Sequence, residues 1–251
     1  MNSRELLFVA WQHPESRKIL PIGRLLRQGE TYEFAYIRAV QEAQQLGFEP
    51  LLTFPVVDEV YRSHELPPLF SNRLMPKSRP EFAQYLSELG LSVGAAEPFA
   101  VLSRSGGRRV TDRLEVFSPP AQCESVYQGV FLLRGVRHVP HGEEALANLP
   151  AQSRLFVMAD VQNPANPAAL ALGDEQKHLL GYVPDYLASE LATARAESSC
   201  LRVTVLKVNP PPAAVHQRVL CQYQCPERVG GVLFRGPRYQ PISKQATDIA
   251  A

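Results

Sequence analysis

The N-terminal half of the chain combines hydrophobic patterns typical of strands with patterns typical of helices. Gly47 and Gly90 are suited to end two of the helical patterns, because glycine readily adopts the conformation at a helix C-terminus. Since both kinds of element occur, this half is predicted to be α+β. The β-prone segments are residues 5–11, 19–26 and 31–36. The helical segments are residues 37–46, 82–89 and 96–102.

The second half contains more strand-like segments, which are short and separated by loop residues. One helix is predicted over 184–195, where apolar residues recur at helical spacing. Short strands with one or two helices predict a small, partly open β-barrel. The predicted strands are residues 126–133, 154–158, 168–172, 178–183, 201–208 and 218–223.

Proline residues divide the chain into two predicted domains. Pro119 and Pro120 follow one apparent strand and precede a polar stretch, so we place the boundary near residue 120. The predicted domains are residues 1–120 and 126–226. The segment 240–251 is expected to be a flexible tail.

Composition and charge exclude several classes of protein. A hydrophobic share of 45% excludes disorder of the whole chain of 251 residues. Lys and Arg number 26 against 25 Asp and Glu, so the net charge of +1 excludes a uniformly basic surface. No run approaches the ~20 apolar residues of a membrane helix, and no secretory signal is recognised. We therefore expect a cytoplasmic protein without a membrane partner.

The sequence lacks the motifs that most often carry catalysis or metal binding. Gly106-Gly107 has neither the spacing nor the Lys-Ser/Thr pair of a phosphate-binding loop, and no Gly-x-Ser-x-Gly is present. His138 and His141 lie three residues apart, but no third ligand is evident. The four cysteines fit no zinc pattern and are expected to be buried, reduced thiols. We therefore predict a non-enzyme with no catalytic residue, no metal and no cofactor.

Tyrosine and arginine recur near one another in the second half, for example at Arg137, Tyr182, Arg218 and Tyr223. Such residues can stack on bases and contact phosphates. Strands also carry tyrosine for packing reasons, and on the pattern alone this second interpretation is favoured.

Three motifs of the second half resemble those of HIRAN domains, in the same order. Phe131-Leu-Leu-Arg-Gly-Val-Arg137-His138 is similar to the opening strand and its turn. Residues 155–172 are similar to the central signature, in which Asn-Pro-Tyr-Asp-x-Asn-Ala separates two strands. His178–Pro184 is similar to a Gly-Tyr-Val-Pro element. The resemblance covers about 127–225 and implies a small β-barrel.

HIRAN domains bind the 3′ end of single-stranded DNA by stacking the terminal base on tyrosines and holding the 3′-hydroxyl with an aspartate. His138 stands in place of the first stacking tyrosine, and its imidazole can stack. Ala165 replaces the second tyrosine and Asn166 the aspartate, so one platform is lost, at ~1–3 kcal/mol per base. The resemblance implies these candidate nucleic-acid-binding residues: Arg137, His138, Asn163, Asn166 and Tyr182.

Residues 20–107 carry a second set of ordered motifs. They include Ile22-Gly-Arg-Leu25, Tyr32-Glu-Phe-Ala-Tyr36, and Arg79-Pro80 leading into a helix that ends in Leu89-Gly-Leu91. This order resembles the N-terminal subdomain of HipA-type serine/threonine kinases, also found as the free-standing partner HipS in three-gene toxin–antitoxin operons. The ATP-binding part of those kinases follows this subdomain, whereas here the HIRAN-like segment follows it.

Two hypotheses follow from these resemblances. The first is a non-enzymatic regulator in a HipA-type toxin–antitoxin system, which docks on the kinase through its N-terminal half and contacts nucleic acid through its HIRAN-like domain. The alternative is a free-standing protein that binds single-stranded DNA ends in DNA repair or phage defence.

Overall fold

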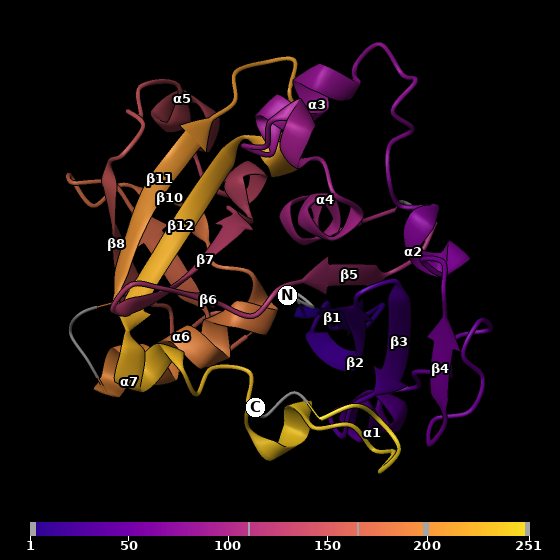
Figure 1. Cartoon of the computed structure of the whole chain (residues 1–251). Coiled ribbons are helices and arrows are strands. Elements are labelled where there is room, and N and C mark those ends of the chain that lie inside the picture. Colours follow the sequence, from indigo (N-terminus) through magenta and orange to yellow (C-terminus); the bar gives the residue numbers. More distant parts are fainter. Residues whose placement is uncertain (1–3, 110, 165, 198–200, 249–251) are drawn as a thin grey trace. The chain divides into compact units, whose positions relative to one another are not determined.

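The computed structural model describes residues 4–109, 111–164, 166–197 and 201–248 (Figure 1). The chain is α+β, as predicted, with two antiparallel sheets, and it divides into two compact units. Unit 1 consists of residues 1–77, 97–119 and 234–251, and unit 2 consists of residues 78–96 and 120–233. Unit 1 is therefore assembled from three separate segments, whereas a single boundary near residue 120 was expected.

Unit 1 is built on a five-stranded antiparallel sheet in the order β4-β3-β2-β1-β5. The strands predicted over 5–11, 19–26 and 31–36 are confirmed as β1, β2 and β3, whereas β4 was not predicted. The strands are β1 (Arg4–Gln12), β2 (Ile19–Gln28), β3 (Thr31–Tyr36), β4 (Val60–Ser63) and β5 (Leu114–Phe117).

The helices of unit 1 are short. They are α1 (Val40–Gln45), α2 (Pro68–Ser71) and α4 (Pro98–Ser105), with the 3₁₀ turn η4 (Pro237–Tyr239). The helix predicted from residue 37 begins at Val40, because the amides of Arg38 and Ala39 bond instead to the carbonyls of Gln240 and Arg238.

Aromatic rings dominate the core of unit 1. Phe34 of β3 stacks on Phe54, with ring centroids 4.1 Å apart. The same ring lies across Gly23 of the neighbouring strand, where a Cβ atom would come within 2.7 Å of it. A side chain at position 23 would therefore displace the central aromatic ring of this core.

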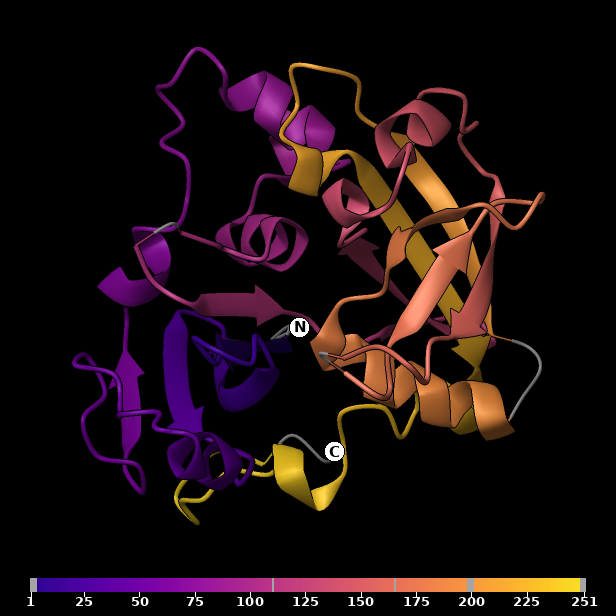
Figure 2. The same ribbon diagram turned by 180° about the vertical axis from the view of Figure 1, so that it is seen from behind.

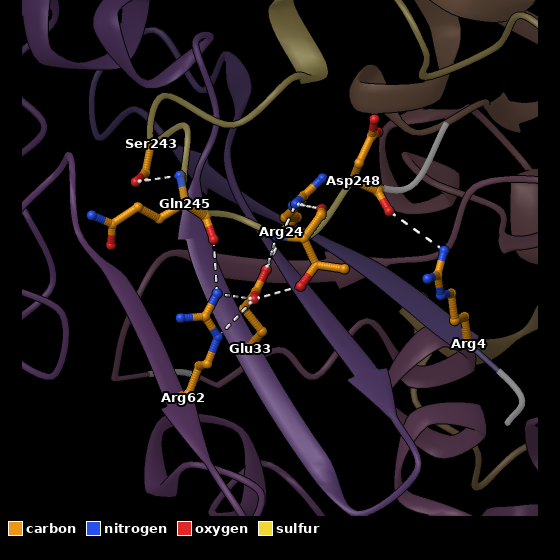
Figure 3. A network of polar contacts seen from close by, with 8 residues as sticks. Arg4, Arg24, Glu33, Arg62, Ser243, Gln245 and Asp248 are labelled. Carbon is orange, nitrogen blue, oxygen red and sulfur yellow. Dashed lines mark hydrogen bonds and ion pairs between the residues drawn. The ribbon is translucent and has the colours of Figure 1, made fainter. Parts of the chain in front are cut away.

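A buried carboxylate joins β2, β3 and β4 of unit 1 (Figure 3). Glu33 lies 3.7 Å from the Arg24 Nη2 atom and 2.9 Å from the Arg62 Nη2 atom. The side chains of Glu33 and Arg24 are 5% and 1% exposed, respectively. Burial lowers the pKa of Arg24, and the carboxylates of Glu33 and Asp248 counteract that shift. Glu33 is thus the counter-ion that makes burial of Arg24 tolerable.

The C-terminal segment bonds to this carboxylate. The amide of Thr247 donates to Glu33 Oε1 at 2.9 Å, and its hydroxyl donates to Oε2 at 2.8 Å. Arg24 donates to the carbonyl of Thr247, and Arg62 donates to the carbonyl of Gln245 at 2.8 Å. Residues 240–248 therefore differ from the flexible tail that was expected, because polar groups there have buried charged partners.

Unit 2 contains a seven-stranded antiparallel sheet in the order β10-β9-β8-β11-β12-β7-β6. The expectation of a barrel is corrected here, because β10 and β6 form separate edges of an open sheet. An isolated bridge between Arg134 and Tyr182 links β10 to the residues that follow β7. The strands are β6 (Ala121–Cys123), β7 (Val126–Leu132), β8 (Arg154–Ala159), β9 (Leu170–Gly173), β10 (Leu179–Tyr182), β11 (Arg202–Val208) and β12 (Val219–Pro226).

The inner face of this sheet is tightly packed. Tyr223 is buried, and its ring crosses Gly129 so closely that a Cβ atom there would lie 2.5 Å from it. Figure 2 shows these strands and the 13-residue helix α6 from behind. The helices are α3 (Phe82–Glu88), α5 (Gly142–Ala147), α6 (Asp185–Glu197) and α7 (Glu227–Gly230). The 3₁₀ turns are η1 (Val93–Ala95), η2 (Val136–His138) and η3 (Val215–Gln217).

Replacing the buried carboxylate should destabilise unit 1 strongly. We expect Glu33→Ala to lower the free energy of unfolding by about 3–5 kcal/mol, because it removes the main counter-ion of the buried Arg24 and the acceptor of both Thr247 donors. The chain has a single tryptophan, Trp11 in β1, so urea unfolding followed by its fluorescence reports on unit 1.

Glu42→Ala is the matched control. Glu42 pairs with Arg238 at 3.2 Å, but both side chains are more than a third exposed, so about 0–1 kcal/mol is expected. Equal losses in the two variants would contradict the role assigned to Glu33.

Candidate nucleic-acid interface

Asp160 is the centre of a polar cluster in unit 2. It follows β8 directly, and its Oδ2 atom accepts hydrogen bonds from the Tyr182 hydroxyl and the Asn163 amide, each at 3.1 Å. Tyr182 is the last residue of β10, so the carboxylate joins two strand ends. The structure thereby brings together two of the predicted site residues, Asn163 and Tyr182.

Asn166 belongs to the same cluster. Its side-chain amide donates to Asp185 Oδ1 at 3.1 Å, and its Oδ1 atom accepts from the amide of Ala168 at 2.9 Å. Its own backbone amide donates to Asn163 Oδ1 at 3.2 Å. The two asparagines therefore hold the shape of the loop between β8 and β9, as Asn side chains commonly do in turns.

The turn after β7 lies against Tyr182. The Arg134 amide donates to the Tyr182 carbonyl at 2.9 Å, and the Tyr182 amide donates to the Arg134 carbonyl at 2.8 Å. Gly135 has a φ of +73°, and a Cβ atom there would lie 3.0 Å from the Tyr182 ring. Glycine therefore permits both the left-handed backbone and the close approach of the ring.

Arg137 and His138 lie on η2, immediately after Gly135. Both side chains are exposed, and the Arg137 Nε–H group donates to His138 Nε2 at 3.3 Å. The predicted pair is therefore presented to solvent on a turn whose first residues are fixed against Tyr182.

The charges of the cluster favour ligand groups that donate hydrogen bonds over ligand groups that are anionic. Burial raises the pKa of Tyr182, and its hydrogen bond to Asp160 raises it further, so the phenol stays protonated at neutral pH. Asp160 and Asp185 add two carboxylates, which accept hydrogen bonds from hydroxyl and amino groups. A phosphate is instead suited to the exposed guanidinium of Arg137.

Two predicted site features have different outcomes. Ala165, where the family has a stacking tyrosine, lies outside the described residues, as does Cys200.

The expectation of buried thiols holds for Cys221 and Cys225 and is wrong for Cys123, which is exposed on the edge strand β6. Burial raises the pKa of Cys225 to about 11, so this thiol stays protonated at neutral pH.

Two negative findings concern the described part of the chain. Within residues 4–109, 111–164, 166–197 and 201–248, no three His, Cys, Asp or Glu side chains are grouped to hold a metal ion. In the same ranges no helix has both the length and the apolar character to cross a membrane. His141, which was weighed as a metal ligand, lies 3.2 Å from Glu144.

Sequence reasoning missed Asp160, Asp185 and the backbone role of Arg134. Asp160 lies within the segment that resembles the HIRAN signature, and Asp185 comes directly after the Gly-Tyr-Val-Pro element. Carboxylates soon after β8 and β10 were the available signal, because both strands pair antiparallel with β9 and therefore end on the same side of the sheet.

Comparison with known proteins gives two similar solved structures. No family model and no curated protein matches the sequence. A protein from Lactobacillus plantarum is 16% identical with a TM-score of 0.32, covering 39% of this chain and 98% of that one. The HIRAN domain of human HLTF is 13% identical with a TM-score of 0.32, covering 44% of this chain and 84% of that one. Neither is described as a HipA-type protein.

Removing the central carboxylate should loosen the site locally. We expect Asp160→Ala to cost about 1–3 kcal/mol, because the Tyr182 hydroxyl and the Asn163 amide lose their shared acceptor. Hydrogen exchange of peptides spanning 160–183 should accelerate. The exposed Glu175→Ala variant is the control and should leave this exchange unchanged. Unchanged exchange in Asp160→Ala would show that the carboxylate does not organise the site.

Proposed function

We propose that the chain is a non-enzymatic binding protein whose unit 2 contacts single-stranded nucleic acid around Tyr182. One observation carries this proposal. The Arg134–Tyr182 bridge and the close contact at Gly135 hold an exposed Arg-His turn beside an aromatic ring and a carboxylate cluster. A cation, an aromatic ring and a hydrogen-bond acceptor can bind the phosphate, the base and a hydroxyl group of a nucleotide, respectively.

Each group has a distinct role in the proposed complex. Arg137 contacts a phosphate, while the rings of His138 and Tyr182 provide stacking surfaces. Asp160 accepts a hydrogen bond from a sugar hydroxyl or a base amino group. Asn163 and Asn166 position the loop, since their amides bond to aspartates of the protein. A net charge of +1 fits binding through a few specific contacts better than binding through a basic surface.

The resemblance to HIRAN domains suggests that the preferred ligand is the 3′ end of single-stranded DNA. In this proposal Asp160 supplies the carboxylate that is missing where Asn166 replaces the family's aspartate. This would preserve recognition of a terminal hydroxyl despite the absence of a stacking tyrosine at Ala165.

Fluorescence anisotropy with a labelled single-stranded oligonucleotide tests this site. Arg137→Ala and His138→Ala should each weaken binding. Arg137→Ala should also reduce the salt slope by about 0.7 for each phosphate that the protein no longer neutralises. A blocked 3′ end should weaken binding by the wild type.

The exposed Arg79→Ala variant is the control, because it removes the same charge elsewhere in unit 2. Binding that both Arg137→Ala and His138→Ala leave unchanged would eliminate the site. Equal binding of free and blocked ends would eliminate only the preference for an end.

We further propose that unit 1 docks on a partner protein, and that this partner is a HipA-type kinase. The resemblance of residues 20–107 to the HipA subdomain motivates this proposal, and we assign the docking contact to Leu52, an apolar side chain that is fully exposed. Tyr36 holds the loop that carries Leu52 through two hydrogen bonds. Its hydroxyl accepts from the Leu51 amide at 2.7 Å and donates to the Phe54 carbonyl at 2.8 Å. Such a rigid loop loses little entropy on binding.

Burial raises the pKa of Tyr36 to about 12. This value sets the pH above which Tyr36 no longer holds the loop around Leu52 through its hydrogen bond to Phe54. The protonated phenol is required to donate to Phe54. The pKa of this phenol is 10 in the unfolded chain and about 12 in the folded chain. The stability that the protonated phenol adds to the fold is therefore complete below pH 10 and is lost as the pH rises towards 12. The loop is therefore held at any physiological pH.

Leu52→Asp should weaken binding of the full chain to a HipA-type kinase from the same genome at least ~10-fold, because it places a charge in an apolar contact. Isothermal titration with the purified kinase measures this. Val93→Asp is the control, since Val93 is 65% exposed in unit 2.

Absence of binding by the wild type, or equal losses in both variants, would remove the kinase role. DNA-end binding without a kinase partner would then favour the alternative role in DNA repair or phage defence.

A further inference from the structure

The outer face of the unit 2 sheet carries a second set of groups suited to nucleic acid. Side chains alternate between the two faces of a strand, so Arg154 and Phe156 of β8 project to the same face. Leu155, between them, is buried on the other face. Phe156 is 41% exposed, and Arg154 is exposed as well.

The strand register continues this face across the sheet. Thr204 of β11 pairs with Arg154 and with Gln222 of β12, and Gln222 pairs with Val130 of β7. Arg202, two residues before Thr204, projects to the same face. Arg202 in turn pairs with Gln224 of β12, and Gln224 pairs with Gln128 of β7. One row of neighbours therefore crosses four adjacent strands and spans about 15 Å, at ~4.8 Å per strand.

The charged side chains of the strands that form this face are all basic. The five strands β6, β7, β8, β11 and β12 contain no aspartate or glutamate. Arg154 and Arg202 are both exposed and stand on neighbouring strands. A polyanion that crosses this face therefore meets two cations and no carboxylate from these strands.

Glutamines fill the remaining polar positions. Gln222 and Gln224 both direct their side-chain amides at Gln128 Oε1, at 3.1 and 3.4 Å. Each glutamine amide has two donor hydrogens and one acceptor oxygen, so the set can bond to base edges of any sequence. Phe156, by contrast, has no polar group, and its exposed ring is suited to stacking.

We propose that this face is a binding platform for single-stranded nucleic acid, with Phe156 stacking on a base and Arg154 and Arg202 contacting phosphates. The inference rests on the proposed function for the class of ligand. The basic side chains of the face favour a polyanion, and the exposed Phe156 ring on the same face favours one with unpaired bases.

Strand β8 connects the platform to the Tyr182 site, because it carries Phe156 and leads directly into Asp160. Phe156 precedes Asp160 by four residues, which is about 13 Å along an extended chain. Sheet modules that bind single strands commonly cover ~4–16 nucleotides. A nucleic-acid strand whose end lies at Asp160 can therefore continue over β8 and β11, and the two sites together extend the footprint beyond a terminal nucleotide.

Oligonucleotide length separates the two sites. Fluorescence anisotropy with 5′-labelled dT12 and dT4 should show Phe156→Ala weakening dT12 binding about 5- to 150-fold, which corresponds to ~1–3 kcal/mol per stacked base. Binding of dT4, which is accommodated at the Tyr182 site, should change less than about two-fold. Phe156→Trp keeps a stacking ring and should retain dT12 binding, which distinguishes stacking from a general disturbance of the sheet.

The arginines are tested by salt dependence. Arg154→Gln with Arg202→Gln should reduce the salt slope for dT12 by about 1.4, at ~0.7 per neutralised phosphate. Lys77→Gln with Arg79→Gln removes two exposed charges outside this face and is the matched control. Equal reductions in the two double variants would assign the effect to net charge and overturn the platform.

The outcomes separate this inference from the proposed function. Unchanged dT12 binding by Phe156→Ala, with dT4 binding still dependent on Arg137, overturns the platform and leaves the Tyr182 site standing. A loss with Phe156→Ala but none with Arg137→Ala and His138→Ala supports the platform and removes the Tyr182 site. Absence of binding of either oligonucleotide by the wild type overturns both.

Discussion

The pair of backbone hydrogen bonds between Arg134 and Tyr182 is the constraint on which the candidate site of unit 2 depends. It joins the end of β10 to the turn after β7, although the strand order places these two strands near opposite edges of an open sheet. The bond pair needs Gly135 beside it, because a side chain there would meet the Tyr182 ring. This link places the exposed turn at Arg137 next to Tyr182, whose hydroxyl bonds to Asp160.

Charge is distributed unevenly over unit 2, and this organises its proposed chemistry. Carboxylates gather where β8 and β10 end, at Asp160 and Asp185, and they bond to the protein's own donors. Arginines stand on the outer face of β8 and β11, where the strands contain no acid. A ligand with hydroxyl groups at its end and phosphates along its length matches both regions, although the whole chain is close to neutral.

Apolar and β-prone residues were sufficient to predict most strands: β1 buries Leu7 to Ala10 as a run, and β11 buries Val203 and Val205 at alternate positions. They could not predict β4, whose residues are mostly half-buried, or the contacts of residues 240–248. Those contacts depend on Glu33, more than 200 residues away in sequence, and a polar segment shows no pattern that reveals a distant counter-ion. Asn163 and Tyr182 were predicted from a resemblance, whereas Asp160 needed the three-dimensional arrangement.

The assembly of unit 1 from three segments has a consequence for biosynthesis. Glu33 and Arg24 are made early, but their partner Thr247 is made more than 200 residues later, after all of unit 2. During translation the early sheet therefore holds a charged pair whose cover does not yet exist, while unit 2 already has its complete set of strands. The network around Glu33 therefore cannot form until Thr247 has been made, whereas every strand of both sheets is synthesised earlier.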